Sequence, residues 1–376
     1  MTEYNNKVYA CIFYGSYLDT LGFYNGKWEF NYNFRNKIVT KDMAHTITSN
    51  IIQHYFVLGG LNINIKNWNS SDDTLLMMSI AKGCLKGGKE KDYIKNLLNN
   101  LEEIKKEKRA SGITTLQSLN KIKRTKNINS IEYSNKMGGN GAAIRSGPIG
   151  LILYREKDLD ELIKQSIISS RITHNHVYGF LGGLVTALFT SYAVRSIKPT
   201  DWVDKLLDLY ESKKIDKYMK TTNIYKKYQR DERTFWDKWY EYREKILNLE
   251  SDRGSYTELY RLDKLLQFTP AVKLNSKELN YANYGSSGIG AVIIAYDALI
   301  RSIHINNDEI KISLDSLIVL STLHFGDNDS TGIIAGTWYG AYQGWGKEIN
   351  LKYNMKQLEF FKELDNISQN IIKKNN

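Results

Sequence analysis

The chain has 376 residues and a mass of 43.4 kDa; 42% of its residues are hydrophobic and 25% are charged. This balance excludes wholesale disorder, and the length is sufficient to bury a core. Only three prolines are present, which favours long helices over a proline-rich β-sandwich. The two cysteines, Cys11 and Cys84, cannot form a disulfide scaffold, so we expect a reducing, cytoplasmic compartment.

The net charge of +11, with a pI near 9.2, is compatible with a nucleic-acid partner. The basic residues, however, lie in stretches rich in lysine and asparagine, such as KIKRTK at 121–126, without a dense pattern of interleaved aromatic residues. We therefore interpret the charge as a solvated surface and expect no nucleic-acid partner. The alternative, a nucleic-acid binder, predicts an affinity that falls steeply with added salt.

Two apolar stretches could be membrane spans or buried helices. Residues 8–18 are too short to cross a bilayer. Residues 177–194 are uncharged over a length near the ~18-residue threshold for a span, but they include three glycines, two threonines and a serine. We expect the second stretch to be the central buried helix of a helical protein, and we expect no membrane contact.

The other segments show the 3.6-residue period of helices, and no hairpin pattern is evident. Apolar residues at 158–170, 308–320 and 356–372 are spaced for amphipathic helices. Two polar segments, 86–136 and 213–233, indicate further helices joined by surface loops.

We therefore predict an all-α protein, monomeric, with one domain over residues 1–350. Residues 351–376 are predicted to form a C-terminal helix and a tail that frays from residue 368 onward.

Two short acidic motifs each stand at the start of an apolar helical run: Ser-Asp-Asp-Thr at 71–74 and Gly-Asp-Asn-Asp-Ser-Thr at 326–331. For the first, helix capping is a sufficient explanation, since serine caps a helix and carboxylates favour its first turn. The second offers several hard oxygen ligands within a few residues, as Mg²⁺ requires. Two such starts favour a metal site, because facing carboxylates repel each other unless cations neutralise them.

Glycines recur at every fourth position after the second motif, at 332, 336, 340 and 344. Each glycine inside a helix costs about 1 kcal/mol relative to alanine. The stripe therefore predicts that another backbone packs very closely against this helix and fixes its acidic start.

A glycine-rich turn, GGNGAAIR at 138–145, exposes backbone N–H groups and leaves room for a diphosphate. A tight turn between helices is at least as good an explanation, since no Walker A or dinucleotide-binding pattern is present. A similar turn at 285–288 has Tyr281 and Tyr284 nearby as possible stacking surfaces. We expect His174 and His176 to line a cavity or to cap the 177–194 helix.

In their order along the chain, these motifs resemble the ADP-ribosylglycohydrolase family, and most closely its ADP-ribosylarginine hydrolases. The matching residues are GFYNGKWEF at 22–30, Ser-Asp-Asp-Thr at 71–74, GAAIR at 141–145, Thr173-His174 and GDNDS at 326–330. The stretch YNGKWEF resembles the arginine branch most specifically. The similarity extends from residue 9 to residue 344; it is poor at 86–136 and 213–256 and nearly absent beyond 350.

The resemblance implies an orthogonally packed, all-α domain that binds two Mg²⁺ ions. It implies that Ser71, Asp72 and Asp73 hold one metal, that Asp327 and Ser330 hold the other, and that Asp329 bridges them. The implied catalytic residues are Asp72, Asp73 and Glu29. The implied substrate contacts are Tyr133, Gly139, Asn140, Gly141, Ala142, Ala143, Arg145, His174, Tyr284 and Ser286.

The implied reaction is Mg²⁺-dependent hydrolysis of the N-glycosidic bond between ADP-ribose and an arginine of a protein. Asp72 or Asp73 would accept the proton of the attacking water. Two departures from the family pattern stand out: Leu18 replaces the first glycine of its GDALG motif, and Ile289-Gly290 replace its His-Asp pair. The second departure leaves undetermined which leaving group the enzyme accepts. The alternatives are another ADP-ribosyl linkage (O-linked serine, ADP-ribose-1″-phosphate or poly(ADP-ribose)) or an inactive ADP-ribose-binding relative.

Overall fold

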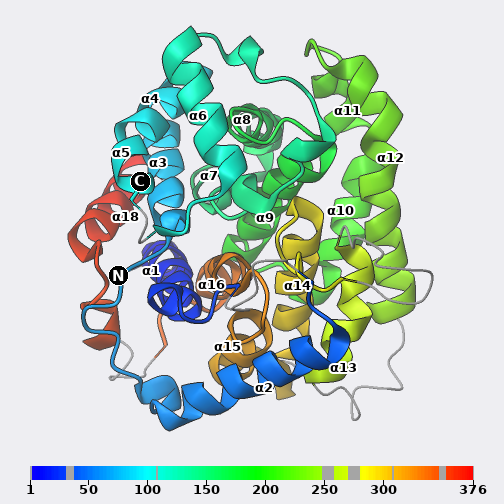
Figure 1. Cartoon of the computed structure of the whole chain (residues 1–376). Helices are drawn as coiled ribbons and strands as arrows, with labels where there is room; N and C mark the ends of the chain where they lie inside the picture. The colour runs from blue at the N-terminus through cyan, green and yellow to red at the C-terminus, as the bar shows by residue number, and fades with distance from the viewer. Residues whose placement is uncertain are drawn as a thin grey trace.

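The computed structural model describes residues 2–30, 38–106, 109–247, 258–269, 280–306, 309–346 and 353–375. Its regular elements in these ranges are helices apart from one short hairpin, which confirms the predicted all-α class (Figure 1). The elements are α1 (Glu3–Phe23), α2 (Lys41–Val57), α3 (Asp72–Lys86), α4 (Glu90–Asn99), α5 (Leu101–Ile104), α6 (Ile113–Thr125), α7 (Gly147–Ile152), α8 (Leu159–Arg171), α9 (Val177–Val194), α10 (Trp202–Glu211), α11 (Lys214–Met219), α12 (Tyr225–Tyr242), α13 (Glu258–Leu265), α14 (Gly288–Arg301), β1 (Ile303–Asn306), β2 (Glu309–Ile312), α15 (Leu314–Thr322), α16 (Asn328–Gln343) and α18 (Phe361–Asn375).

Helices α1 and α16 pack against each other along most of their length, with their backbones in close contact. A Cβ atom added at Gly336 would lie 2.5 Å from the carbonyl oxygen of Tyr14, and one at Gly332 would lie 3.0 Å from that of Leu18. The close backbone predicted from the glycine stripe is therefore confirmed within α16, whereas Gly344 follows the helix as its C-cap. This contact holds the acidic start of α16 against the last turns of α1.

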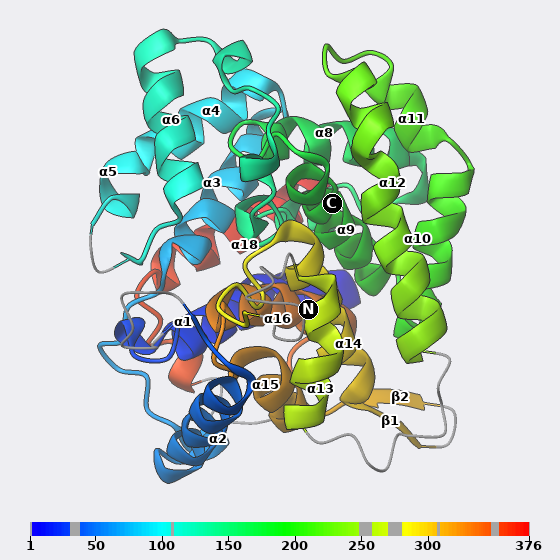
Figure 2. The ribbon, with the colours of Figure 1, turned by 45° about the vertical axis from the view of Figure 1, so that its right-hand side comes forward.

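Helix α9 lies inside the molecule, between α7, α8, α12, α14 and α16 (Figures 1 and 2). It is long and apolar enough to cross a membrane, but 94% of it is buried within the fold. The prediction of a central buried helix over 177–194 is confirmed.

Two local predictions were wrong. Residues 309–312 form strand β2, antiparallel to β1, and α15 begins only at Leu314, so the predicted helix over 308–320 starts too early. The alternation of Ile310 and Ile312 with charged residues suits pairing with β1 better than a helical turn. Residue 308 and the predicted domain boundary at 350 lie outside the described residues.

The predicted fraying from residue 368 was also wrong, because α18 continues to Asn375. The carbonyl oxygen of Asn375 accepts a hydrogen bond from Arg155 at 2.9 Å, and its side-chain amide donates to the carbonyl of Ile152 at 3.3 Å. These contacts fix the helix end against the turn after α7.

The two polar segments, 86–136 and 213–233, fold into helices as predicted and lie at the same end of the molecule (Figure 2). They touch each other: the Tyr133 hydroxyl donates to Asp231 at 2.8 Å, and the Asn223 amide donates to Asn129 at 3.4 Å. Two segments that resemble the family poorly are therefore in contact with each other.

Candidate active site

The two acidic helix starts meet beside the contact between α1 and α16. Ser71 caps α3 by accepting the N–H of Asp73 at 3.1 Å. Asp327 precedes α16 and is its N-cap residue. The hydroxyl of Ser330 donates to Asp73 Oδ2 at 2.9 Å, which links the two motifs directly. The first motif therefore caps a helix, and its carboxylates also meet those of the second motif. The two interpretations of the acidic helix starts are both correct.

Asp19 of α1 joins the two motifs, although the sequence analysis did not count it among the site residues. Its fully buried carboxylate accepts the Ser71 hydroxyl at 2.6 Å and both the N–H and the hydroxyl of Thr74. The available signal was a single aspartate inside the apolar N-terminal helix, since a buried carboxylate requires hydrogen-bond partners or a cation.

Carboxylate oxygens gather in two groups, each able to hold a cation. One group is Asp19, Asp73 and Asp329, and the other is Glu29, Asp327 and Asp329; within each group the ligand atoms lie within 4.8 Å of one another. Carboxylate oxygens are the preferred ligands of hard divalent ions. Asp329 belongs to both groups, which is the position of a bridging ligand. Asp72 belongs to neither, so the grouping differs from the ligand set that the resemblance implied.

Without a cation, these carboxyl groups stay protonated at pH values well above those at which aspartate and glutamate usually ionise. Burial raises the pKa of Asp19 and of Asp327 to about 6. Burial, followed by repulsion from Asp19 and Asp327, raises the pKa of Asp72 to about 7. The pKa values of Asp73 and Asp329 are raised well above normal by burial first and by neighbouring carboxylates second. A bound cation would offset this repulsion, so the donor set fits a metal.

Glu29 approaches the cluster from a turn after α1 that aromatic packing holds in place. The Trp28 ring is buried and lies 4.8 Å from the ring of Tyr24, centre to centre. The N–H of Phe30 donates to the carbonyl of Gly326 at 3.3 Å, which fixes Glu29 next to the second acidic motif. Burial and the facing aspartates raise the pKa of Glu29 well above its usual value.

The glycine-rich turn forms the adjoining wall. A Cβ atom at Gly141 would lie 2.6 Å from the ring of His174, so a larger residue does not fit there. The Asn140 side-chain amide donates to Asp327 Oδ2 at 3.1 Å, and its backbone N–H donates to the carbonyl of Ser286 at 3.1 Å. The glycine-rich turn, the 285–288 turn and the carboxylates are therefore continuous.

A cavity of about 550 Å³ opens beside this wall. Two of the predicted substrate contacts, Gly139 and Ser286, line it, whereas Ala142 and Ala143 are buried behind the turn. The complete lining is Asn135, Lys136, Gly138, Gly139, His176, Tyr178, Asp231, Thr234, Asn283, Ser286 and Ser287.

Two predicted substrate contacts are instead core residues. Tyr284 is fully buried with its ring 5.0 Å from that of His324, so it presents no face for stacking. Arg145 is also fully buried, and it donates to the Thr173 hydroxyl at 2.7 Å and to the carbonyl of Ser169 at 3.0 Å. Proximity in sequence to a glycine turn does not determine the direction of a side chain. Both side chains point into the core because packing buries them.

Tyr133 does not line the 550 Å³ cavity either. It lines a neighbouring cavity of about 420 Å³, and its ring packs against that of His176 at 5.2 Å. Among the lining residues of the 550 Å³ cavity, Tyr178 is the aromatic one, and the sequence analysis did not select it. Its position two residues after His176 was the available signal.

The two histidines have different roles. His176 caps α9 by accepting the N–H of Tyr178 at 3.3 Å, as one predicted alternative required, and it also lines the cavity. His174 is buried under the glycine-rich turn with Nδ1 2.8 Å from the Thr173 hydroxyl. Burial, followed by the charge of Arg145, lowers the pKa of His174 to about 3, so this imidazole is neutral at physiological pH.

Behind the acidic groups, Arg109 connects the C-terminal segment to the first motif. Its guanidinium donates to the carbonyl of Ser70 at 2.8 Å and to both carboxylate oxygens of Glu359, at 2.6 and 2.8 Å. Glu359 also accepts the N–H of Ser70 at 3.2 Å. Arg109 pairs separately with Glu103 at 2.5 Å. Both backbone groups of the residue before Ser71 are therefore held by this ion pair.

The chain belongs to the ADP-ribosylglycohydrolase family, whose sequence model matches residues 1–375. The family consists of metal-dependent hydrolases that act on ADP-ribosyl linkages, and the membership expected from the motifs is confirmed.

Individual relatives agree with this membership. The chain is 32% identical over 383 residues to ADP-ribosylhydrolase ARH1 of Dictyostelium discoideum, covering 94% of this chain and 90% of the relative. It is 31% identical over 373 residues to the putative ADP-ribosyl glycohydrolase L444 of Acanthamoeba polyphaga mimivirus, covering 96% of this chain and 68% of the relative. A solved structure, an ADP-ribosylglycohydrolase-related protein complex, has the same fold with a TM-score of 0.57 at 16% identity over both full chains.

Proposed function

We propose that this chain is a Mg²⁺-dependent hydrolase that cleaves the N-glycosidic bond between ADP-ribose and an arginine side chain of a protein. The main support is the two sets of three carboxylates, which have Asp329 in common and lie beside the wall formed by the glycine-rich turn. The YNGKWEF stretch that carries Glu29 supports the arginine linkage within the family. A cytoplasmic location and a monomeric state remain part of this proposal.

The residues of the site divide into groups that hold metal, diphosphate and water. Asp19, Asp73 and Asp329 would hold one Mg²⁺ ion, and Glu29, Asp327 and Asp329 the other. When bound, the ions would neutralise the carboxylates and orient the ribose hydroxyls beside the anomeric carbon. The backbone of the glycine-rich turn would receive the diphosphate, because its exposed N–H groups suit an anion.

Asp72 belongs to neither metal-binding group, so we assign to it the role of proton acceptor. In the proposed step, the water oxygen forms a bond to the anomeric carbon as the bond from that carbon to the arginine nitrogen breaks. Asp72 takes one proton from the water and then releases it to the departing guanidine, directly or through solvent, so that the arginine leaves as guanidinium and Asp72 is ionised again. Neutral His174 would support this chemistry only as a hydrogen-bonding group beside the turn.

The test compares two substrates, an arginine-ADP-ribosylated protein and a serine-ADP-ribosylated one, each with Mg²⁺ and with EDTA. Release of ADP-ribose from the arginine linkage alone, and only with Mg²⁺, is the expected result. Release from neither substrate by folded protein would overturn the proposal in favour of a binding-only relative. Substituting Asp72 or Asp73 by Asn should abolish release while leaving the protein folded.

A second candidate is hydrolysis of another ADP-ribosyl linkage. The observation that favours it is Ile289-Gly290, which replaces a polar pair of the family pattern. Ile289 is buried in α14, and the N–H of Gly290 donates to the Ser287 cap at 3.0 Å. Cleavage of the serine linkage in preference to the arginine linkage would select this candidate.

A further inference from the structure

The positive charge of the chain is concentrated in two segments. Residues 86–136 contain 13 basic and 6 acidic residues, and residues 213–233 contain 8 basic and 3 acidic residues. Their net charges are therefore +7 and +5, which leaves the rest of the chain at −1. A general enrichment in lysine would raise the charge throughout the chain. The excess instead lies in the two segments that fold side by side.

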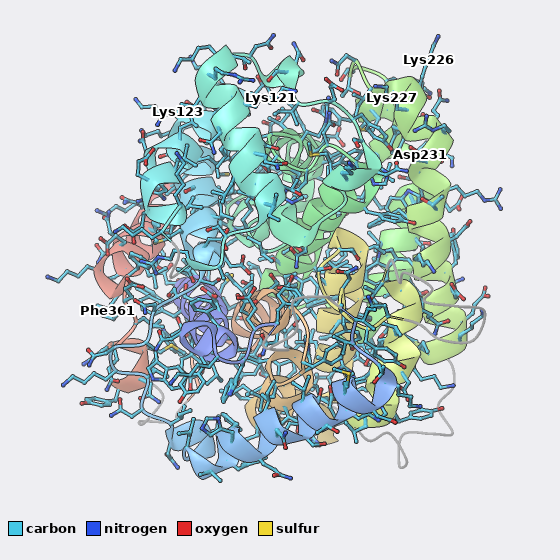
Figure 3. The ribbon with its side chains drawn as sticks, in the orientation of Figure 1. Lys121, Lys123, Lys226, Lys227, Asp231 and Phe361 are labelled. Atoms are coloured by element: carbon cyan, nitrogen blue, oxygen red, sulfur yellow. The ribbon has the colours of Figure 1, made fainter. Side chains whose placement is uncertain are left out.

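Four lysines of these segments stand at one end of the molecule (Figure 3). Figure 3 shows Lys121 and Lys123 on α6, and Lys226 and Lys227 on α12, at the same end of the fold. We call these four residues, together with Lys126 at the end of α6, the basic face. Between α6 and α12 lies the cavity of about 420 Å³, which residues 128–133 line from one side and residues 221–224 from the other.

Most of this charge is not neutralised internally. Among the described residues, no carboxylate lies within 4 Å of the ammonium groups of Lys126, Lys226 or Lys227. Lys121 and Lys123 have exposed partners, Glu132 at 3.9 Å and Glu102 at 3.0 Å. Such exposed pairs are weak and easily exchanged for another anion.

The two segments that carry the basic face also reach the candidate substrate cavity. Lys136 of the first segment and Asp231 of the second both line that cavity. The ammonium group of Lys227 lies 5.9 Å from the centre of the Tyr133 ring, which also packs against His176 in the cavity wall. Lys227 therefore lies next to this wall through Tyr133, and a polypeptide that extends from the cavity along α6 and α12 would meet the other lysines of the basic face (Figure 3).

We infer that the basic face binds acidic residues that flank the modified arginine in the protein substrate. This inference rests on the proposed function, because that reaction brings a polypeptide to the cavity mouth in every turnover. Opposite charges across such a rim raise the association rate and select among partners. A nucleic acid fits less well: the aromatic rings of the two segments, in the described residues, are buried or half-buried and offer no exposed stacking platform.

The test uses three substrates: free ADP-ribosylarginine, a peptide with glutamates on both sides of one ADP-ribosylarginine, and the same peptide with glutamines. At low salt, we expect kcat/KM for the acidic peptide to exceed that for the glutamine peptide by about ten-fold, mainly through KM. High salt should remove the difference, since it screens exposed charges.

The variant carries Lys121→Glu, Lys123→Glu, Lys126→Glu and Lys226→Glu. It should lose the preference for the acidic peptide and keep its rate on free ADP-ribosylarginine. The matched control places the same charge change elsewhere, as Lys66→Glu, Lys157→Glu, Lys356→Glu and Lys362→Glu at exposed positions outside both segments. The control should keep the preference.

The outcomes distinguish failure of this inference from failure of the proposed hydrolase function. Equal rates for the two peptides, or a preference that survives in the four-lysine variant, would overturn the inference while the hydrolysis itself stands. Inhibition by a single-stranded oligonucleotide that exceeds inhibition by an unmodified acidic peptide would reassign the face to nucleic acid. Absence of release from all three substrates would instead contradict the proposed function.

Discussion

The buried acidic centre and the exposed basic face bring like charges together by different structural means. In the centre, Asp19 and Asp329 are held close together because glycines let the backbones of α1 and α16 approach. On the basic face, three of the five lysines have no carboxylate within 4 Å among the described residues, and the other two have exposed partners. The first arrangement depends on backbone geometry and tolerates little change, whereas the second depends on net charge and tolerates substitution at single positions.

The largest effect should follow from removing the carboxylate that the two acidic groups share. Asp329→Asn is expected to reduce turnover by about 10³-fold or more, because metal ligation contributes several kcal/mol to such reactions. The metal-free variant should be at least as stable as the wild type, since the change removes a repelling buried charge. Turnover assays and thermal unfolding in EDTA measure both. A variant that is active but unstable would contradict the assignment.

A smaller effect should follow from forcing α1 and α16 apart. Gly336→Ala is expected to destabilise the protein by about 1–3 kcal/mol, because the new methyl group collides with the carbonyl of Tyr14. It should also weaken Mg²⁺ binding by separating Asp19 from Asp329. Ala341→Gly in the same helix is the control: it should cost about 1 kcal/mol and leave metal affinity unchanged. Denaturant unfolding and calorimetric titration distinguish the two.

The ion pair behind the first motif allows a finer comparison. Glu359→Gln should weaken Mg²⁺ binding by about ten-fold, corresponding to about 1.4 kcal/mol, because Glu359 fixes the backbone of Ser70. Glu103→Gln removes the other carboxylate of Arg109 without touching Ser70, so it should reduce stability but not metal affinity. Equal metal affinities in the two variants would show that the C-terminal segment does not position the site.

The last effect concerns pH and is seen only in stability without metal. The folded-state pKa values of Asp19 and Asp327, about 6, and of Asp72, about 7, lie above the unfolded value near 4. The folded protein therefore binds more protons than the unfolded chain between about pH 4 and 7, and its stability should fall as pH rises through that range. In EDTA, Tm should drop by several degrees from pH 5 to pH 8. Saturating Mg²⁺ should remove most of that drop, and a drop that persists would count against the metal site.

Local sequence patterns were sufficient to predict much of this molecule. The Ser71 cap, the acidic start at Asp327 and the glycine stripe each depend on a few neighbouring residues, and all three predictions agree with the structure. The helical class followed from periodicity, and the family followed from short motifs in a fixed order.

Most of the errors arise from tertiary packing, which local patterns do not contain. Asp19 reaches the site because α16 and α3 pack against α1, and the lone aspartate in an apolar helix does not show which elements it faces. Tyr284 was selected by its proximity to a glycine turn, and Tyr133 because the family carries an aromatic residue there. Tertiary packing directs the Tyr284 ring into the core and the Tyr133 ring against His176. The β1–β2 hairpin was missed because each strand is only four residues long.

The most direct test of the central claim is a calorimetric titration of Mg²⁺ into metal-free protein. The wild type is predicted to bind two ions per chain, and Asp329→Asn to bind at most one, because Asp329 is the only carboxylate shared by the two groups among the described residues. Binding of no ion by the wild type, or two undiminished sites in Asp329→Asn, would contradict the account.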